Sequence, residues 1–152
     1  MPNRIDRFSG KFRFLSNFWI VSVPLDNEWY PSVEHAYQAA KTTDSENRRR
    51  IRYSLSPADA KRLGSNVILR QDWEQVKLQY MRYLVWEKFS LHIDLGQKLL
   101  DTTDTELIEG NTWGDKFWGV CRGIGENWLG KILMETRSLL AYYRGIEHDG
   151  QK

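Results

Sequence analysis

The sequence has few residues that could form disulfides, metal sites or membrane segments. Its only cysteine, Cys121, excludes an intrachain disulfide framework and is typical of a reducing compartment. Three histidines at distant positions, with no second cysteine, argue against a structural zinc site, and we expect no metal and no cofactor. No apolar run approaches the roughly 18 residues of a membrane span, and the N-terminus has no apolar signal core. We therefore expect a cytoplasmic protein without a membrane partner.

Charge of one sign is also scarce. The chain carries 22 Lys and Arg against 20 Asp and Glu, so a net charge of +2 favours no class of partner. A local basic segment is the exception and comprises Arg48, Arg49, Arg50, Arg52, Lys61 and Arg62. Such a run is either a solvated helix face or a contact for phosphate or nucleic acid.

Aromatic residues, in contrast, are abundant, with seven Trp, seven Tyr and six Phe. Most of them must belong to the core, because each ring buries roughly 150–250 Å². The excess is suited to lining a pocket for a base or nucleoside.

The length fits a single domain over 1–152, with a loose polar tail over about 147–152. Caps and apolar spacing predict helices over 33–43, 44–52, 57–64, 72–90, 93–100 and 128–143. Aromatic and β-branched runs predict strands over 18–23, 28–30, 106–109 and 117–121, the last two paired with each other. The regular alternation of a doubly wound fold is missing. The predicted class is α+β, a predominantly helical domain with a small antiparallel sheet.

The helix that follows Ser32 carries polar groups on one face. Glu34, Gln38 and Lys41 lie at i, i+4 and i+7, so a carboxylate, an amide and an amine border its apolar stripe. Glu34 and Lys41 are about 10 Å apart along the axis, too far for an ideal ion pair but within reach of one ligand. In the ordinary alternative, an acid in the first turn and a base in the last simply suit the helix dipole. His35 is either a structural histidine or a ligand contact.

A glycine-rich turn late in the chain runs into a helix at Asn127. Gly123 and Gly125 let the backbone approach a ligand, and the first amides of a helix attract anions such as phosphate. Asn127 as an N-cap is a sufficient structural explanation of the same pattern. Gly130 costs about 1 kcal/mol relative to alanine, which indicates close packing or a ligand passing the first turn. The spacing matches neither a Rossmann fingerprint nor a Walker motif.

Two further segments combine polar and aromatic groups. Trp113 is suited to stack on a base, Gly114 to admit a phosphate or sugar, and Asp115 to bind ribose hydroxyls. A structural turn explains the same three residues. Asn17 is a polar residue among aromatics, where it either caps the backbone or binds a ligand hydroxyl.

Four segments, taken together and in this order, resemble the NADAR (NAD and ADP-ribose) family, also called the YbiA-like proteins. The segments are Phe14-Leu15-Ser16-Asn17-Phe18, residues 29–41 (WYPSVEHAYQAAK), Trp113-Gly114-Asp115 and residues 123–137 (GIGENWLGKILMETR). Any one of them is weak, but four in sequence over most of the chain are specific. The resemblance implies a YbiA-like fold and hydrolysis of N-glycosidic bonds to ribose.

The resemblance also implies two kinds of substrate. Some members resemble hydrolases that remove ADP-ribose from guanine and so reverse a DNA-modifying toxin, and another branch resembles an N-glycosidase of riboflavin-pathway intermediates. Lys116-Phe117-Trp118 stand where that second branch would have a more glycine-rich, polar run. We expect removal of ADP-ribose from guanine in nucleic acid or nucleotides, with a functional link to a DNA ADP-ribosyltransferase toxin. The alternatives are the riboflavin-linked activity, a non-catalytic module for ADP-ribose or NAD, and a nucleic-acid-binding module built on the basic run.

The expected roles follow from this substrate. Glu34 stabilises the positive charge on the ribose or activates water, and Lys41 traps the ring-opened C1″ aldehyde as a Schiff base or neutralises phosphate. The expected substrate contacts are Asn17, Ser32, His35, Gln38, Trp113, Gly114, Asp115, Gly123, Gly125, Asn127 and Gly130. This assignment requires the early helix and the late glycine turn to face each other.

Overall fold

The computed structural model describes residues 3–150, with the side chains of all of these except residues 146–148. In this part of the chain, helices dominate and are accompanied by three two-stranded sheets, so the predicted α+β class is confirmed. The chain forms two compact units, residues 17–88 and residues up to 16 together with those from 89 onward. That these units make up one domain over 1–152 stays a prediction.

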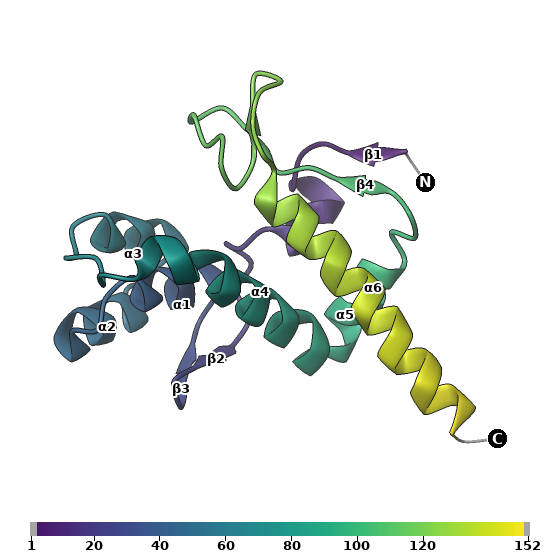
Figure 1. The fold of residues 1–152 in the computed structure, drawn as a ribbon, viewed down its shortest axis with the longest axis horizontal. Helices are drawn as coiled ribbons and strands as arrows, with labels where there is room; N and C mark the ends of the chain where they lie inside the picture. Colours follow the sequence, from purple (N-terminus) through teal and green to yellow (C-terminus); the bar gives the residue numbers. More distant parts are fainter. Residues whose placement is uncertain (1–2, 151–152) are drawn as a thin grey trace. The chain divides into compact units, whose positions relative to one another are not determined.

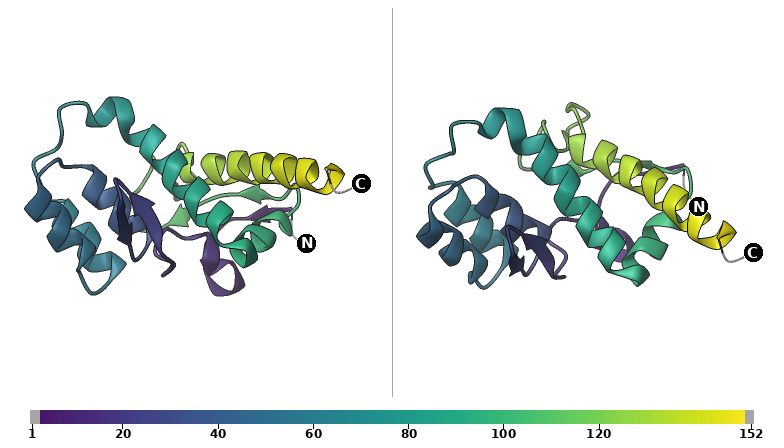
Figure 2. Two further views of the ribbon diagram at one scale, coloured as in Figure 1. Left: turned by 90° about the horizontal axis from the view of Figure 1, so that it is seen from below. Right: turned by 60° about the horizontal axis from the view of Figure 1, so that its bottom comes forward.

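The unit of residues 17–88 combines one hairpin with packed helices. Its elements are β2 (Val23–Leu25), β3 (Glu28–Tyr30), α1 (Val33–Ala40), α2 (Ser45–Arg52), α3 (Pro57–Gly64) and most of α4 (Trp73–Leu91). Asp26 and Asn27 form the hairpin turn and both have positive φ, which lets a two-residue turn follow the twist of its strands. Figures 1 and 2 show α1, α2 and α3 side by side, with the hairpin next to α1.

The three short helices begin where the sequence predicts, because a side chain caps each one. Ser32, Asp44 and Ser56 accept hydrogen bonds from amides in the first turns of α1, α2 and α3. The strand predicted over 18–23 is wrong for residues 18–22, since only the last residue of that range lies in β2. Aromatic and β-branched composition favours a strand, but a strand forms only where a partner is available.

α1 is buried along its whole length. All eight of its residues are buried, because α2, α3 and the hairpin pack around it. Glu34, His35 and Gln38 therefore lie in the interior, where each polar group needs a partner.

The other unit is built around the C-terminal helix. Its elements are β1 (Arg4–Ile5), the 3-10 helix η1 (Gly10–Leu15), the end of α4, α5 (Ile93–Leu100), β4 (Glu106–Leu107), β5 (Gly110–Asn111), β6 (Val120–Cys121) and α6 (Trp128–Asp149). α6 packs on α5 and on β4, and both are drawn next to it in Figure 1. Among residues 3–150, no helix has both the length and the apolar composition needed to cross a bilayer.

The strand pairing differs from the prediction. β4 pairs with β1 and β5 pairs with β6, both in parallel, and among residues 3–150 only β2 and β3 form the predicted antiparallel type of sheet. The predicted pairing of 106–109 with 117–121 is wrong for Glu106 and Leu107, which pair with the N-terminal strand β1, but the Glu109 carbonyl does accept a hydrogen bond from the Val120 amide at 2.9 Å. Ladders of two residues carry no hydrophobic alternation by which the sequence could identify the partner.

α6 is longer than predicted. It passes through Gly145 and ends at Asp149, whereas the sequence predicts a helix to about Tyr143 that ends near Gly145. The expected tail over 147–152 is thus helical up to Asp149, and residues 151–152 lie outside the described part of the chain. A glycine lowers helix propensity by about 1 kcal/mol, which packing of a long helix readily offsets.

Candidate active site

A small network of hydrogen bonds anchors the start of α1. Ser32 Oγ accepts from the His35 amide at 3.1 Å, and the Glu34 amide donates to the Asn17 carbonyl at 3.1 Å. The side-chain amide of Asn17 donates to Met81 Sδ on α4 at 3.5 Å. The backbone of Glu34 is thereby fixed, and Asn17 lies directly beside it.

Glu34 and Gln38 form a buried pair one helical turn apart. Their exposed fractions are 8% and 3%, and Gln38 Nε2 donates to Glu34 Oε1 at 2.8 Å. The structure therefore brings these two predicted site residues into direct contact. A carboxylate held by a neutral amide away from bulk water is suited to act as a general base or to stabilise a developing cation.

Lys41 follows the last residue of α1 and is half-buried. Its Nζ lies 5.5 Å from the centre of the Tyr37 ring. Burial lowers the pKa of Lys41 below its ordinary value, and the attraction of Glu34 opposes this change. Repulsion from Lys61 and Lys77 lowers the pKa further. A larger share of this amine is therefore neutral than in a free lysine, and the neutral form is the one that attacks an aldehyde.

His35 is a structural residue of α1. It is only 1% exposed, its Nδ1 lies 2.7 Å from Ser32 Oγ, and its Nε2 lies 3.2 Å from the Ser54 carbonyl. Because a carbonyl only accepts, Nε2 carries the proton and Nδ1 accepts from the Ser32 hydroxyl. Burial lowers the pKa of His35, which favours this neutral form. Both side chains have hydrogen-bond partners inside the protein, which favours the structural interpretation of His35, and contact of either residue with substrate stays a prediction.

The late glycine turn is folded back on the segment that precedes it. The amides of residues 126–129 donate to the carbonyls of residues 116–119 at 2.8–3.3 Å. These amides donate within the chain, which favours the structural explanation of the turn, and diphosphate binding at the helix start stays a prediction. The backbone at Gly123 has φ 78° and open space around it, whereas Gly125 packs against the backbone of Gly119. Contact between the glycine turn and a ligand stays a prediction.

Asn127 ties the start of α6 to the β4 segment. Its Nδ2 donates to the Leu107 carbonyl at 2.9 Å, and its Oδ1 accepts from the Glu109 amide at 3.0 Å. Asn127 stands where the cap was predicted, but its amide bridges to another segment instead of to the first turn or a ligand. A Cβ at Gly130 would collide with the Leu107 carbonyl and the Asn127 side chain. Close packing, one of the two predicted reasons for Gly130, is the one that the structure supports.

Residues 111–115 form a hydrogen-bonded turn. Asn111 accepts from the Asp115 amide at 3.1 Å and donates to the Asp115 carbonyl at 2.8 Å. Asp115 Oδ1 accepts from two amides that follow it. The structural explanation thus accounts for Asn111 and for one carboxylate oxygen. Trp113 is 62% exposed, next to Gly114 with its positive φ, and its stacking on a ligand stays a prediction.

The basic run is largely paired within the unit of residues 17–88. Arg48 Nη1 lies 2.6 Å from Asp26 of the hairpin turn. Arg52 Nη1 lies 2.7 Å from Glu28 of β3. Arg49 and Arg50 both pair with Glu46 of the same helix. These contacts tie α2 to the hairpin and favour the first interpretation of the run, a solvated helix face.

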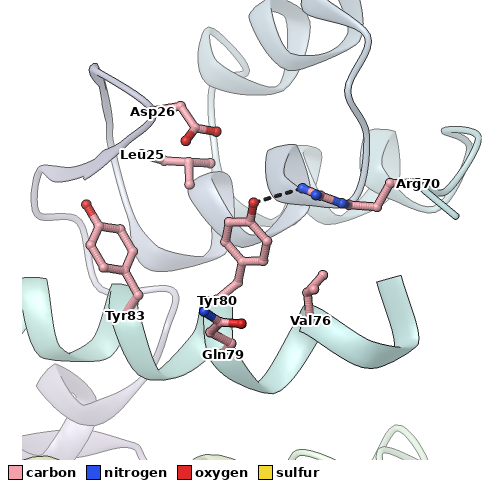
Figure 3. Close-up of a pocket in the computed structure, with 7 residues that line it drawn as sticks. All are labelled: Leu25, Asp26, Arg70, Val76, Gln79, Tyr80 and Tyr83. Carbon is pink, nitrogen blue, oxygen red and sulfur yellow. Dashed lines mark hydrogen bonds between the residues drawn. The ribbon is translucent and has the colours of Figure 1, made fainter. Parts of the chain in front are cut away.

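A pocket of about 330 Å³, which was not predicted from the sequence, opens between the hairpin and α4 (Figure 3). Its lining residues are Leu25, Asp26, Arg70, Val76, Gln79, Tyr80 and Tyr83. Arg70 Nη1 donates to the Tyr80 hydroxyl at 2.8 Å, and its Nε lies 2.6 Å from Asp72. One signal could have found it: Tyr80 and Tyr83 lie at i and i+3 of a predicted helix and so share a face.

The pocket wall connects to the end of α1. The Arg70 amide donates to the Lys41 carbonyl at 2.8 Å. The rings of Tyr37, Trp73 and Tyr80 follow one another with centroid spacings of 5.3 and 6.2 Å. This series of rings leads from the lysine to the pocket and gives the end of α1 a rigid aromatic support.

The predicted site residues thus fall into two groups. The unit of residues 17–88 brings together Asn17, Glu34, Gln38 and Lys41. The turns of 111–115 and 123–130 belong to the other unit. That these turns face α1 stays a prediction. Within the described residues, no group of three or more His, Cys, Asp or Glu is arranged to hold a metal ion.

These features define the class of protein: a mainly helical α+β protein whose central helix buries an acid and an amide beside an amine of lowered pKa. The NADAR domain model matches residues 6–141, and the chain belongs to this family. The family resemblance is therefore confirmed.

Relatives and one solved structure agree with this family. N-glycosidase YbiA of Shigella boydii is 41% identical over 136 residues, 88% of this chain and 84% of that protein. An N-glycosidase of Nostoc punctiforme is 39% identical over 128 residues, 80% of this chain and 81% of that protein. A riboflavin biosynthesis protein of Vibrio vulnificus is 38% identical over 130 residues, 84% of this chain but 35% of that protein. The NMR structure of the E. coli protein YbiA has a TM-score of 0.81 and 34% identity, covering 95% of both chains.

Proposed function

We propose that this protein hydrolyses the N-glycosidic bond between ribose C1″ and a base nitrogen, and that its substrate is ADP-ribosylated guanine in nucleic acid or nucleotides. One observation carries the proposal: the buried Glu34 carboxylate is held by Gln38 on a central helix that ends in a half-buried lysine. Two of the relatives named above are N-glycosidases, which supports the reaction type.

The reaction needs one group that tolerates positive charge and one that handles a proton. When the bond between C1″ and nitrogen breaks, the base leaves with the electron pair and takes up a proton, while positive charge builds on the ribose. Water then adds to C1″ and gives a proton to the Glu34 carboxylate. The products are ADP-ribose and the unmodified guanine, which stays in its nucleic acid or nucleotide, and the proton on Glu34 returns to solvent.

Lys41 offers a second route at the same carbon. Its neutral amine attacks the ring-opened C1″, the base leaves, and an imine joins the lysine to the sugar. Water then hydrolyses the imine, restores the amine and releases ADP-ribose. The lowered pKa of Lys41 supports this route, because the amine must be neutral to attack.

The remaining parts of ADP-ribose would contact the two late turns. Trp113 has the exposure needed to stack on a ring, and the open backbone at Gly123 admits a diphosphate without a side chain in the way. Asp115 and Asn17 are the proposed partners of ribose hydroxyls.

The test is a product analysis with two probes. The protein is incubated with an oligonucleotide ADP-ribosylated on guanine and, separately, with riboflavin-pathway intermediates, and the released products are identified by mass. We expect free ADP-ribose and unmodified oligonucleotide from the first probe. Glu34→Gln should lower this turnover by about 100-fold or more. The matched control is Glu46→Gln, which alters an exposed acid of α2 and should leave turnover unchanged.

Two outcomes would contradict the proposal, and each would support a different function. Cleavage of the riboflavin-pathway intermediates alone would favour the riboflavin-linked activity, a substrate class that the name of the Vibrio vulnificus relative makes worth testing. Tight binding of ADP-ribose with no base released over a long incubation would identify a non-catalytic reader.

A further inference from the structure

Gln38 is enclosed by α1 and α3. Its side chain is 3% exposed, its Nε2 donates to Glu34 Oε1, and its own Oε1 is buried without a hydrogen-bond partner. A buried acceptor without a partner is costly, and native proteins contain few such groups. Hydrogen bonding alone therefore does not explain the position of this side chain, and the packing around it must contribute.

Gly64, the last residue of α3, lies directly against the Gln38 side chain. A Cβ at this position would overlap Gln38 Oε1 and would lie 2.7 Å from Gln38 Cδ. The amide of Gln38 thus rests directly on the backbone of α3, and only glycine leaves room for it. The packing of α1 against α3 fixes the amide between Gly64 and Glu34.

The chemistry of the pair fixes the orientation of the amide. If the amide were rotated by half a turn, its oxygen would face a carboxylate oxygen, and two acceptors would repel each other. Nε2 must therefore face Glu34, and the carbonyl must face Gly64. A side chain confined in this way removes the rotamer freedom that a glutamate would otherwise have.

We infer that Gln38 is a positioning residue for the Glu34 carboxylate. Gly64 is a second positioning residue, which acts by keeping the Gln38 side chain in place. The inference rests on the proposed function of Glu34. It replaces the predicted contact between Gln38 and substrate, because the buried amide is occupied by the acid. A carboxylate held in one orientation keeps its reacting oxygen at a fixed distance from C1″, and a displacement of about 1 Å can cost up to about 100-fold in rate.

The first test removes the hydrogen-bond donor but keeps the side-chain volume. Gln38→Met should lower kcat on the ADP-ribosylated guanine oligonucleotide by about 10- to 100-fold and leave KM within about two-fold, because only the orientation of the acid is lost. Gln97→Met is the matched control, since Gln97 donates to Asp101 at i+4 over 2.9 Å on an exposed face. This control should keep the wild-type kcat. Equal turnover of Gln38→Met and the wild type would overturn the inference.

The second test perturbs Gln38 from α3. Gly64→Ala should lower kcat in the wild-type background, because its methyl group displaces the Gln38 amide. In the Gln38→Ala background, the same change should lower kcat by no more than about two-fold, because the amide is already gone. Equal losses in both backgrounds would show that Gly64 acts independently and would overturn its assigned role.

A third measurement separates this inference from the proposed function. In the ¹H–¹⁵N spectrum, the side-chain NH₂ of Gln38 should exchange slowly with solvent and should shift when Glu34 is replaced by Gln. A protein that shows this signature but cleaves neither probe would refute the proposed function alone. Rapid exchange of the Gln38 amide, with or without turnover, would refute the positioning role.

Discussion

Ser32 Oγ and His35 Nδ1 lie 2.7 Å apart at the start of α1, and the same oxygen accepts a hydrogen bond from the His35 amide. One hydroxyl therefore caps the helix and orients a buried imidazole whose Nε2 reaches the Ser54 carbonyl. This arrangement holds the first turn of the helix that carries Glu34. The stability of that turn is thus a condition for the geometry of the acid.

Ser32→Ala should destabilise the protein more than an ordinary cap mutation. It removes the cap of α1 and leaves His35 Nδ1 buried without its donor, for an expected loss of about 2–3 kcal/mol. Ser56→Ala is the control, because Ser56 caps α3 through the Asp59 amide alone and should cost about 1 kcal/mol. The free energies of unfolding are measured in urea at pH 7. Equal losses would mean that the bond to the imidazole adds nothing.

Gly130→Ala should destabilise the protein although alanine is the better helix former. A Cβ at this position would meet the Leu107 carbonyl and the Asn127 amide, so α6 would have to move away from β4. We expect a loss of about 1–3 kcal/mol. Gly145→Ala in the same helix has nothing within 4 Å of the new Cβ and should gain up to about 1 kcal/mol. Thermal unfolding of both variants measures whether each substitution stabilises or destabilises the protein. A gain in stability for Gly130→Ala would contradict the packing argument.

Lys88 should make stability depend on pH in the neutral to alkaline range. It is 1% exposed, and burial lowers its pKa from 10.5 to about 7. Between these two values the unfolded chain binds more protons than the folded one, so raising the pH favours the folded state. Relative to Lys88→Met, the wild type should gain up to about 1.4 kcal/mol per pH unit from pH 7 to pH 10. Urea unfolding at several pH values measures this difference, and parallel curves for the two proteins would contradict a lowered pKa.

Lys41 should be captured by borohydride if it forms an imine with the sugar. Reduction during turnover of the ADP-ribosylated oligonucleotide should add the mass of reduced ADP-ribose to the peptide that contains Lys41. Because burial lowers the pKa of this amine, turnover should rise with pH and level off below the 10.5 of an unperturbed lysine.

Lys41→Arg keeps the positive charge but cannot attack as a neutral amine, and it distinguishes the two roles of the lysine. We expect this variant to give no adduct and to lose most turnover. An arginine variant that retains wild-type turnover, together with a wild type that gives no adduct, would leave Lys41 an electrostatic role only.

Much of the local structure was predictable because its causes are local. Asp44, Ser56 and Pro57 stand at the starts of two helices, where a side-chain oxygen satisfies an amide or a fixed φ suits the first turn. The face shared by Glu34 and Gln38 follows from helical spacing alone, and the structure joins these two side chains by a hydrogen bond. The expected contacts of substrate with Trp113, Asp115 and Lys41 stay predictions.

Other features depended on partners that are distant in sequence. The amides of residues 126–129 are suited to bind phosphate by the local pattern, but in the structure they donate to the carbonyls of residues 116–119. Arg70 and Asp26 line one pocket although 43 positions separate them, and neither belongs to a recognisable motif. Parallel pairing of β1 with β4 joins the N-terminus to a segment about a hundred residues later.

The amino-acid sequence by itself determined where most helices begin, which side chains share a helix face, and the family to which the chain belongs. These properties follow from hydrogen bonds and spacing within a few residues, and from motifs in a fixed order. Only the tertiary structure decided that the Gln38 amide donates to Glu34, that Gly64 leaves room for this amide, and that the Asn127 side chain bonds to the backbone beside β4. These outcomes depend on which backbone atoms packing brings within a few ångströms, and no local pattern encodes that distance.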